Sequence, residues 1–419
     1  MKKIIAMLLV LSLALAVYAG GAKEQSEGDT AETIVWAGWS GEEEASKAIF
    51  TKMRETYEAK SGNRVSWVGW TWADTAQQLL IRLQGGEQLD IAQVDISIFN
   101  TIAQTGTLAD LNDIFGREWL AETFPESALE VGNIDGKQLA LPWSMASITM
   151  VYNPEILKRA GWDTVPETVE EFEQCLEDIK ALGEDIVPYG VSTKDATAAG
   201  DFMPWLWTFG SSVFNEDGSV NLGEEAVSTV EWYQKLLAKG YIKMDVGRGD
   251  ARQLFAQGKM AFYDDAVVAK GQAVNNGVKP EDVVKVCSAM KRPVLKSGDE
   301  SQSTMWGHML VIFNSSSHKA ASADFAKTLV SDDIALEYFE KNGMPPVTKS
   351  AGELDEVKND AYLRGFMEAT ASAKLEETAR LQNASEIKAI MTEELQAALL
   401  GQKTASDAVS SMKSRISSL

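Results

Sequence analysis

The chain has 419 residues, 45% hydrophobic and 24% charged, which is typical of a globular protein with room for two domains and excludes disordered and fibrous classes. Its 61 Asp and Glu outnumber 39 Lys and Arg, and the formal net charge of −22 argues against a nucleic acid or an anionic membrane as partner. Two His and two Cys leave little material for zinc, copper or iron–sulfur chemistry, so we expect no metal and no cofactor.

The first 19 residues have the three parts of a secretory signal peptide. Lys2 and Lys3 precede an apolar run over residues 4–17, and Ala19 closes a site of small residues suited to cleavage. This run is shorter than the ~20 residues of a spanning helix, and no later segment reaches that length. We expect cleavage after Ala19 and export of a soluble protein to a periplasm, with an uncleaved signal anchor as the alternative. No Cys lies near the cleavage point, so we expect no lipid anchor there.

Strand and helix patterns alternate after a polar segment, residues 20–32, that we expect to be a flexible tail. Apolar runs predict strands at 33–37, 64–68 and 90–94, and helical spacing predicts helices over 43–60, over 75–83 and from 98. This βαβαβ order indicates a parallel sheet with helices on both faces. A ligand of such a sheet lies beyond the carboxyl ends of the strands.

Two further alternations follow. Strands are predicted at 147–152, 189–192, 260–263, 283–287 and 308–313, and helices from 169, over 223–239, from 319 and from 332. Thr168 and Glu171 have capping-box spacing, Ser331 is an expected cap, and Gly401 separates two helices in the last 40 residues. The order predicts two α/β lobes with more than one chain crossing between them.

The two cysteines are expected to be core residues. Cys175 lies on the apolar face of the helix from 169, and Cys287 ends the apolar run at 283–287. A disulfide between them is the alternative, because an exported protein permits one.

Tryptophan next to a carboxylate at a strand end is the most informative pattern. Sugar rings present C–H faces to aromatic side chains and hydroxyls to carboxylates, so such a grouping supplies both contacts. The candidate ligand residues at strand ends are Trp39 and Glu44; Trp70 and Trp72; Asp95; and Asp264 and Asp265. The other candidates are Trp143 at the expected lobe crossing, Asp201, Trp205 and Trp207 at the start of a helix, and Trp306 at the start of a strand.

Packing is the alternative for each of these tryptophans. Trp67, Trp119, Trp162 and Trp232 are assigned to packing, and Trp36 is left undecided. Asp264 and Asp265 could instead cap the following helix. His308 begins a strand and is expected to be a hydrogen-bonded histidine beside the cleft rather than a metal ligand.

The order of these motifs resembles the type II solute-binding proteins of ABC sugar importers, the maltose- and glucose-binding group of extracellular solute-binding protein family 1. Five stretches and the closing helices at 399–416 carry the resemblance. The stretches are 34–44 (IVWAGWSGEEE), 86–111, 151–182 with its VYNPEILKRAGW start, 254–265 (LFAQGKMAFYDD), and 306–346 ending in NGMPP.

The resemblance implies a two-lobed α/β fold of the periplasmic-binding-protein type II, each lobe a mainly parallel sheet flanked by helices. The N-terminal lobe would comprise 31–141 plus 303–345, and the C-terminal lobe 142–302 plus 346–419. It also implies a sugar held in the cleft between lobes, hinge closure, and delivery to an ABC transporter permease by a monomer. The positions expected to line the cleft are Trp39, Asp95, Trp143, Trp205, Asp265, Trp306 and Gly307.

Enzymatic function has little support in the sequence. No nucleophile elbow, phosphate-binding loop, zinc-protease motif or dinucleotide fingerprint is present. A glycosidase needs only two carboxylates, so that class is the main alternative to a binding protein. A receptor for a non-sugar solute such as a polyamine is the second alternative.

Overall fold

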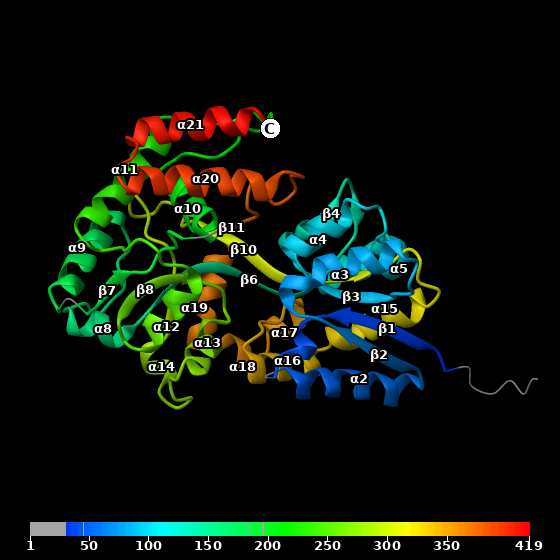
Figure 1. Ribbon diagram of the computed structural model, residues 1–419. Helices are drawn as coiled ribbons and strands as arrows, with labels where there is room; N and C mark the ends of the chain where they lie inside the picture. The colour runs from blue at the N-terminus through cyan, green and yellow to red at the C-terminus, as the bar shows by residue number, and fades with distance from the viewer. Residues whose placement is uncertain (1–30, 45, 184, 195–196) are drawn as a thin grey trace, which may run out of the picture.

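The computed structural model describes residues 31–44, 46–183, 185–194 and 197–419, so the expected signal peptide and nearly all of the tail lie outside the described residues. Figure 1 shows two lobes, joined near the middle by the long strands β6 (Leu141–Tyr152) and β10 (Ser303–Ile312). Within the described ranges no helix combines the length and the apolar character needed to span a bilayer.

The N-terminal lobe is built on three parallel strands, β1 (Thr33–Gly38), β2 (Arg64–Gly69) and β3 (Ile91–Asp95). These confirm the predicted βαβαβ unit. Helices with an apolar face cover both sides of this sheet, as amphipathic helices between parallel strands require. The helices of this lobe are η1 (Ser40–Glu42), α2 (Lys47–Ser61), α3 (Trp72–Gln84), α4 (Ile96–Ala103), α5 (Leu111–Phe115), α6 (Arg117–Thr123), α7 (Glu126–Val131), α15 (Lys319–Leu329), α16 (Asp332–Asn342) and α17 (Lys349–Gly352). A short hairpin, β4 (Asn133–Ile134) and β5 (Lys137–Gln138), completes it.

The C-terminal lobe contributes mostly short strands and many helices. Its strands are β7 (Val187–Tyr189), β8 (Met260–Asp265), β9 (Ser288–Met290) and β11 (Ala373–Lys374). Its helices are α8 (Pro154–Arg159), α9 (Val169–Lys180), α10 (Thr197–Thr208), α11 (Glu224–Ala238), α12 (Arg248–Ala256), α13 (Ala269–Asn275), α14 (Val283–Val286), α18 (Asp355–Lys358), α19 (Ala361–Thr370), α20 (Ala384–Leu399) and α21 (Ala405–Ser417).

Strands β6 and β10 pass from one lobe to the other. β10 pairs antiparallel with β3 over His308–Ile312 and with β6 along most of its length. β6 then pairs antiparallel with β8 and β9 from Thr149 onward. The continuous strand order is β2-β1-β3-β10-β6-β8-β7, so the two lobes share one mixed sheet. The lobe boundaries expected at 141/142, 302/303 and 345/346 stay a prediction, and the pairing partner of β6 changes several residues after the first of them.

Local signals in the sequence agree with the structure in most elements. Thr168 and Glu171 form a capping box at the start of α9, as predicted. The prediction of a strand at 283–287 was wrong, because residues 283–286 form α14 and Cys287 ends it. Both cysteines are buried and free, so no disulfide joins them. Ser331 precedes α16, but its hydroxyl donates to the Thr328 carbonyl and does not cap the helix.

Candidate functional site

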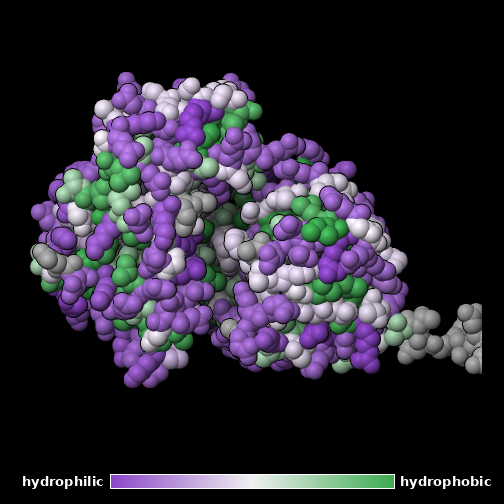
Figure 2. All heavy atoms as spheres, viewed as in Figure 1, coloured by the Kyte–Doolittle hydropathy of each residue, from purple (hydrophilic) through white to green (hydrophobic). Residues whose placement is uncertain are grey.

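A hollow separates the two lobes in the space-filling view (Figure 2). Strand pairing shows which strand ends meet near it. His308 lies opposite Asp95, the last residue of β3, and β10 continues from there beyond the end of β3 toward the other lobe. Thr149 likewise lies opposite Asp265, the last residue of β8, and β6 continues beyond it toward the N-terminal lobe. The carboxyl ends of β3 and β8 therefore face each other across the middle of the shared sheet, where a ligand site is expected.

Trp72 and Asp95 form the rim of the N-terminal lobe. The Trp72 indole N–H donates to Asp95 Oδ2 at 2.6 Å, and Asp95 Oδ1 accepts from the Ile98 N–H at 2.7 Å as the N-cap of α4. Burial raises the pKa of Asp95, while these hydrogen bonds and the charge of Lys388 on α20 oppose that rise. Trp72 itself is 57% exposed. The result is an aromatic ring fixed in orientation and open to solvent.

Trp39, His308 and Trp306 form a row of rings where β10 passes the end of β3. The His308 ring centroid lies 4.9 Å from that of Trp39 and 4.8 Å from that of Trp306. His308 Nδ1 is 3.2 Å from Gln93 Nε2, which also donates to Ser40 Oγ at 2.8 Å. Burial lowers the pKa of His308 to about 3, so the imidazole is neutral. Trp39 is buried and Trp306 half-buried, so only Trp306 presents a substantial surface.

Gly307 lies between Trp306 and His308 in β10, at a point where β10 and β6 approach so closely that a side chain would not fit. A Cβ at Gly307 would lie 2.9 Å from Met145 Cγ and 3.0 Å from the Ser144 carbonyl oxygen. The glycine therefore allows β10 to pair with β6, and its effect on a ligand is indirect.

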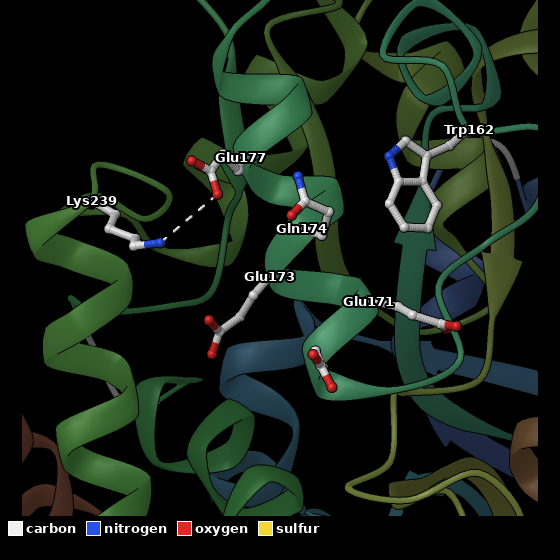
Figure 3. A pocket seen from close by; sticks show the side chains of 7 residues that line it. Trp162, Glu171, Glu173, Gln174, Glu177 and Lys239 are labelled. Atoms are coloured by element: carbon white, nitrogen blue, oxygen red, sulfur yellow. Dashed lines mark ion pairs between the residues drawn. The ribbon is translucent and has the colours of Figure 1, made fainter.

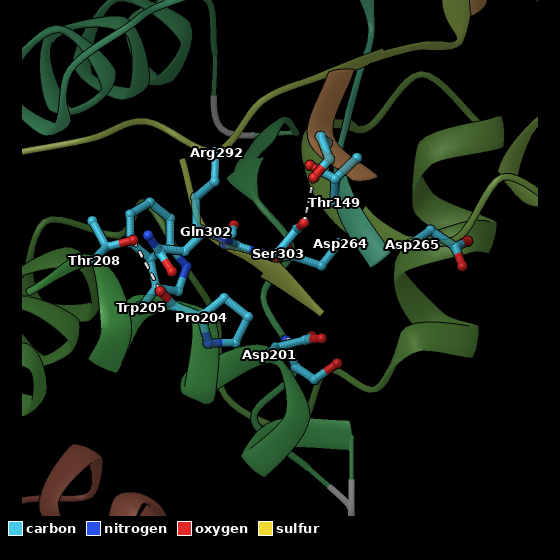
Figure 4. A network of polar contacts seen from close by, with 12 residues as sticks. Thr149, Asp201, Pro204, Trp205, Thr208, Asp264, Asp265, Arg292, Gln302 and Ser303 are labelled. Carbon is cyan, nitrogen blue, oxygen red and sulfur yellow. Dashed lines mark hydrogen bonds and ion pairs between the residues drawn. The ribbon is translucent and has the colours of Figure 1, made fainter. Parts of the chain in front are cut away.

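Asp264 and Trp205 belong to a buried network in the C-terminal lobe (Figure 4). Asp264 pairs with Arg292 and accepts from the Tyr189 hydroxyl. The Trp205 indole donates to the same hydroxyl at 2.9 Å, and the Arg292 guanidinium lies 4.7 Å from the Trp205 ring centroid. All of these side chains are fully buried. The network gives each of these buried polar groups a partner in place of water.

Asp201 and Asp265 are each paired with an arginine of α12. Arg252 donates to both carboxylate oxygens of Asp265, at 2.8 Å from Nε and 2.7 Å from Nη2. Arg248 pairs with Asp201, which also accepts from the Ser192 N–H at 3.0 Å. Burial raises the pKa of Asp201 to about 6 against the opposing charge of Arg248. Both aspartates are buried, whereas both arginines keep part of their surface open.

The remaining predicted residues lie in different surroundings. Trp143 is 4% exposed and stacks on Tyr338, with ring centroids 5.3 Å apart. Trp207 donates to Glu377 at 2.6 Å and lines a hollow of about 270 Å³ with residues of the loop before β10. Glu44 is exposed and paired with Lys47 at 2.7 Å. Trp70 is half-buried, and the Arg82 guanidinium lies 5.2 Å from its ring centroid.

Tryptophans assigned to packing are found in packed surroundings. Trp36, which the sequence left undecided, is fully buried and stacks on Phe50 at 4.7 Å. Trp232 is buried, and Trp67 and Trp119 are half-buried against the core of the N-terminal lobe.

A hollow of about 400 Å³ lies away from the cleft, between α9 and α11 (Figure 3). It is lined by Trp162, Gln174, Lys239 and the glutamates 170, 171, 173 and 177. Most of these polar groups already have partners: Glu173 accepts from the Trp232 indole and pairs with Lys235, and Glu171 closes the capping box. This hollow is therefore a part of helix packing and does not resemble a binding site.

Sequence reasoning missed the arginines of the site. Arg248 and Arg252 precede the predicted strand at 260–263 and are one helical turn apart, which was a visible signal. Arg292 had no local signal, because its partner Asp264 lies 28 residues away. Nowhere in the described part of the chain do three or more His, Cys, Asp or Glu side chains gather as a metal ion would require.

Comparison with known proteins gives one family and several relatives. A model described as bacterial extracellular solute-binding protein matches residues 52–365. The diacetylchitobiose binding protein DasA of Streptomyces coelicolor is 26% identical over 278 residues, covering 62% of this chain and 63% of its own. The cyclic alpha-maltosyl-1,6-maltose binding protein of Arthrobacter globiformis superposes with a TM-score of 0.78 at 22% identity, covering 93% and 99% of the two chains. UgpB of Mycobacterium tuberculosis, in complex with glycerophosphocholine, superposes with a TM-score of 0.76 at 18% identity, covering 93% and 98%.

Proposed function

Because the chain belongs to the bacterial extracellular solute-binding proteins, we propose that it is the receptor of an ABC importer and that it captures a sugar in the cleft between its lobes. Members of this family bind solutes and are not enzymes, which sets aside the glycosidase alternative. They are exported and work with a membrane permease. We further propose that the signal peptide is cleaved after Ala19 and that the mature protein is a monomer. It would deliver the bound sugar to a sugar-specific permease.

The observation that carries the proposal is the exposed ring of Trp72, oriented by Asp95 at the mouth of the hollow. Exposing the indole of Trp72 to water is unfavourable, and the hydrogen bond that fixes its orientation costs side-chain entropy. A residue with a purely structural role would not require either cost. Its exposed face matches the C–H face of a sugar ring. Diacetylchitobiose and cyclic maltosyl-maltose are the ligands named for two of the relatives, which supports the same class here.

We propose a smaller set of ligand contacts than the sequence alone suggested. Trp72 and Trp306 supply stacking surfaces, Asp95 orients Trp72, and Trp70 borders the same rim. Trp39 and Gly307 shape the base of the hollow. The structural surroundings support packing or electrostatic roles for Trp143, Trp205, Trp207, Asp201, Asp264, Asp265 and Glu44.

The proposal is tested by binding to a panel of mono- and oligosaccharides that includes glucose, maltose and diacetylchitobiose. Intrinsic tryptophan fluorescence and melting temperature are recorded at increasing concentrations of each sugar, with spermidine as a non-sugar comparison. A saturable change with at least one sugar, and no new reducing ends after incubation, is expected. A saturable change with spermidine alone, or no change with any sugar, would contradict the proposal.

A further inference from the structure

We propose that Arg248 and Arg252 are hydrogen-bond donors to the ligand, and that Asp201 and Asp265 compensate their charge so that the cleft prefers a neutral sugar to an acidic one. This inference rests on the proposed function and deepens it, because it names the charge class of the sugar and the residues that select it.

The two arginine–aspartate pairs have the same asymmetry. The Asp201 and Asp265 side chains are 2% and 0% exposed, whereas those of Arg248 and Arg252 are 17% and 25% exposed. Part of each arginine side chain is therefore open to solvent, whereas the carboxylates behind them are not. The pair Asp264–Arg292 differs, since both of its side chains are 0% exposed.

The Arg252–Asp265 pair lies next to the crossing between the lobes. Asp265, which holds Arg252, is the last residue of β8 and lies opposite Thr149 in the strand that crosses between the lobes. Val268, three residues later, packs against the core of the N-terminal lobe. Arg248 is the first residue of α12 and lies one turn before Arg252, so both side chains emerge on the same face of the helix.

Each arginine keeps donors for a ligand. A guanidinium has five N–H groups, and the bidentate pair of Arg252 with Asp265 uses Nε and Nη2, leaving Nη1. Arg248 uses Nη2 toward Asp201, which leaves Nη1 for a ligand, whereas its Nε is buried. Sugar hydroxyls accept hydrogen bonds, and charged donors make such bonds stronger than neutral donors do.

Charge compensation decides between neutral and acidic sugars. A ligand carboxylate entering the cleft would be attracted by a guanidinium and repelled by the aspartate bound to it, and it would lose its own hydration. A neutral hydroxyl loses far less hydration and keeps the full directional hydrogen bond. Removing one aspartate charge leaves an uncompensated arginine, which should shift the preference toward an acidic sugar.

The experiment compares dissociation constants for three matched sugar pairs: glucose with glucuronate, galactose with galacturonate, and maltose with its 6′-carboxylate. Wild-type protein is expected to bind the neutral member of at least one pair about tenfold more tightly than the acidic member. Asp265→Asn should move that ratio about tenfold or more toward the acidic member. Glu173→Gln is the control, since it removes one carboxylate charge from an ion pair with Lys235 away from the cleft and should leave the ratio unchanged. Arg252→Gln should weaken binding of both members without favouring the acidic one.

Two results overturn the inference while leaving the proposed function intact. The first is a ratio of neutral to acidic dissociation constants that is the same in Asp265→Asn as in wild type. The second is a wild-type preference for the acidic member. If Asp265→Asn does not fold, as judged by circular dichroism, Asp201→Asn supplies the same comparison at the second pair. Absence of binding by any sugar to any folded variant contradicts the proposed function itself, and the inference with it.

Discussion

Trp72 and Asp95 are joined by a 2.6 Å hydrogen bond that fixes an exposed indole beyond the carboxyl ends of β2 and β3. The two residues are 23 positions apart and lie at the starts of different helices, α3 and α4. Their contact links the ends of β2 and β3. Asp95, which the sequence suggested as a ligand contact, thus also orients the aromatic side chain of Trp72.

Replacing Trp72 by alanine should weaken sugar binding by about tenfold or more, because it removes a stacking surface that only the ligand would cover. The side chain is largely exposed, so the free energy of unfolding should change little. Calorimetric titration with the best sugar of the panel measures the effect. Trp72→Phe keeps a ring and loses the N–H, so an intermediate affinity is expected. Wild-type affinity in Trp72→Ala would exclude Trp72 from the site.

Trp143→Ala should lower the free energy of unfolding by about 3–5 kcal/mol, the range for removing a buried aromatic side chain. Trp143 stacks on Tyr338 and meets the edges of Trp36 and Phe50 within the N-terminal lobe. Urea denaturation followed by circular dichroism gives the change in stability. Trp143→Phe should cost less. Unchanged stability combined with loss of sugar affinity would show that Trp143 contacts the ligand and that its packing is secondary.

The position of Trp143 shows which features of the structure could be predicted from the sequence and which could not. The order of strands and helices was readable because each apolar run and each cap is a local signal, and the βαβαβ unit followed from it. A tryptophan near a strand end is also a local signal, but its direction depends on which face of β6 is covered. Since β6 is buried on both faces, its sequence has no alternation to reveal that direction.

The partners of the carboxylates were beyond sequence reasoning for a related reason. Asp265 binds an arginine 13 residues before it, and Asp201 binds one 47 residues after it. Neither spacing is set by helix or strand geometry, so only the assembled lobe brings the groups together. The sequence therefore identified both carboxylates as candidates but not the arginines that compensate their charge.

Both cysteines should be unreactive in the folded protein. Burial raises the pKa of each thiol to about 12, so almost no thiolate forms at neutral pH. Titration with a thiol-specific chromogenic disulfide should therefore detect no reactive thiol in native protein and two in denaturant. Migration on a non-reducing gel should match that under reducing conditions. Two thiols that appear only after reduction would reveal a disulfide and contradict the structure.

Stability should depend on pH through His308, whose folded-state pKa is about 3 against an ordinary value near 6.5. As the pH falls below 6.5 the unfolded chain binds a proton at this imidazole and the folded chain does not. The free energy of unfolding should therefore fall with decreasing pH, by up to about 1.4 kcal/mol per unit for this one group.

The variant His308→Gln isolates that contribution, because glutamine can keep a hydrogen bond to Gln93 but takes up no proton. Asp201 acts in the opposite direction: its folded-state pKa is raised to about 6, so it favours the folded state as the pH drops from 6 toward 4. This and other shared groups cancel in the difference between variant and wild type. Urea denaturation at pH 7.5, 6, 5 and 4.5 should show wild-type stability declining more steeply than that of the variant. Parallel curves would mean that His308 is protonated in the folded protein, and its buried position between Trp39 and Trp306 would have to open in acid.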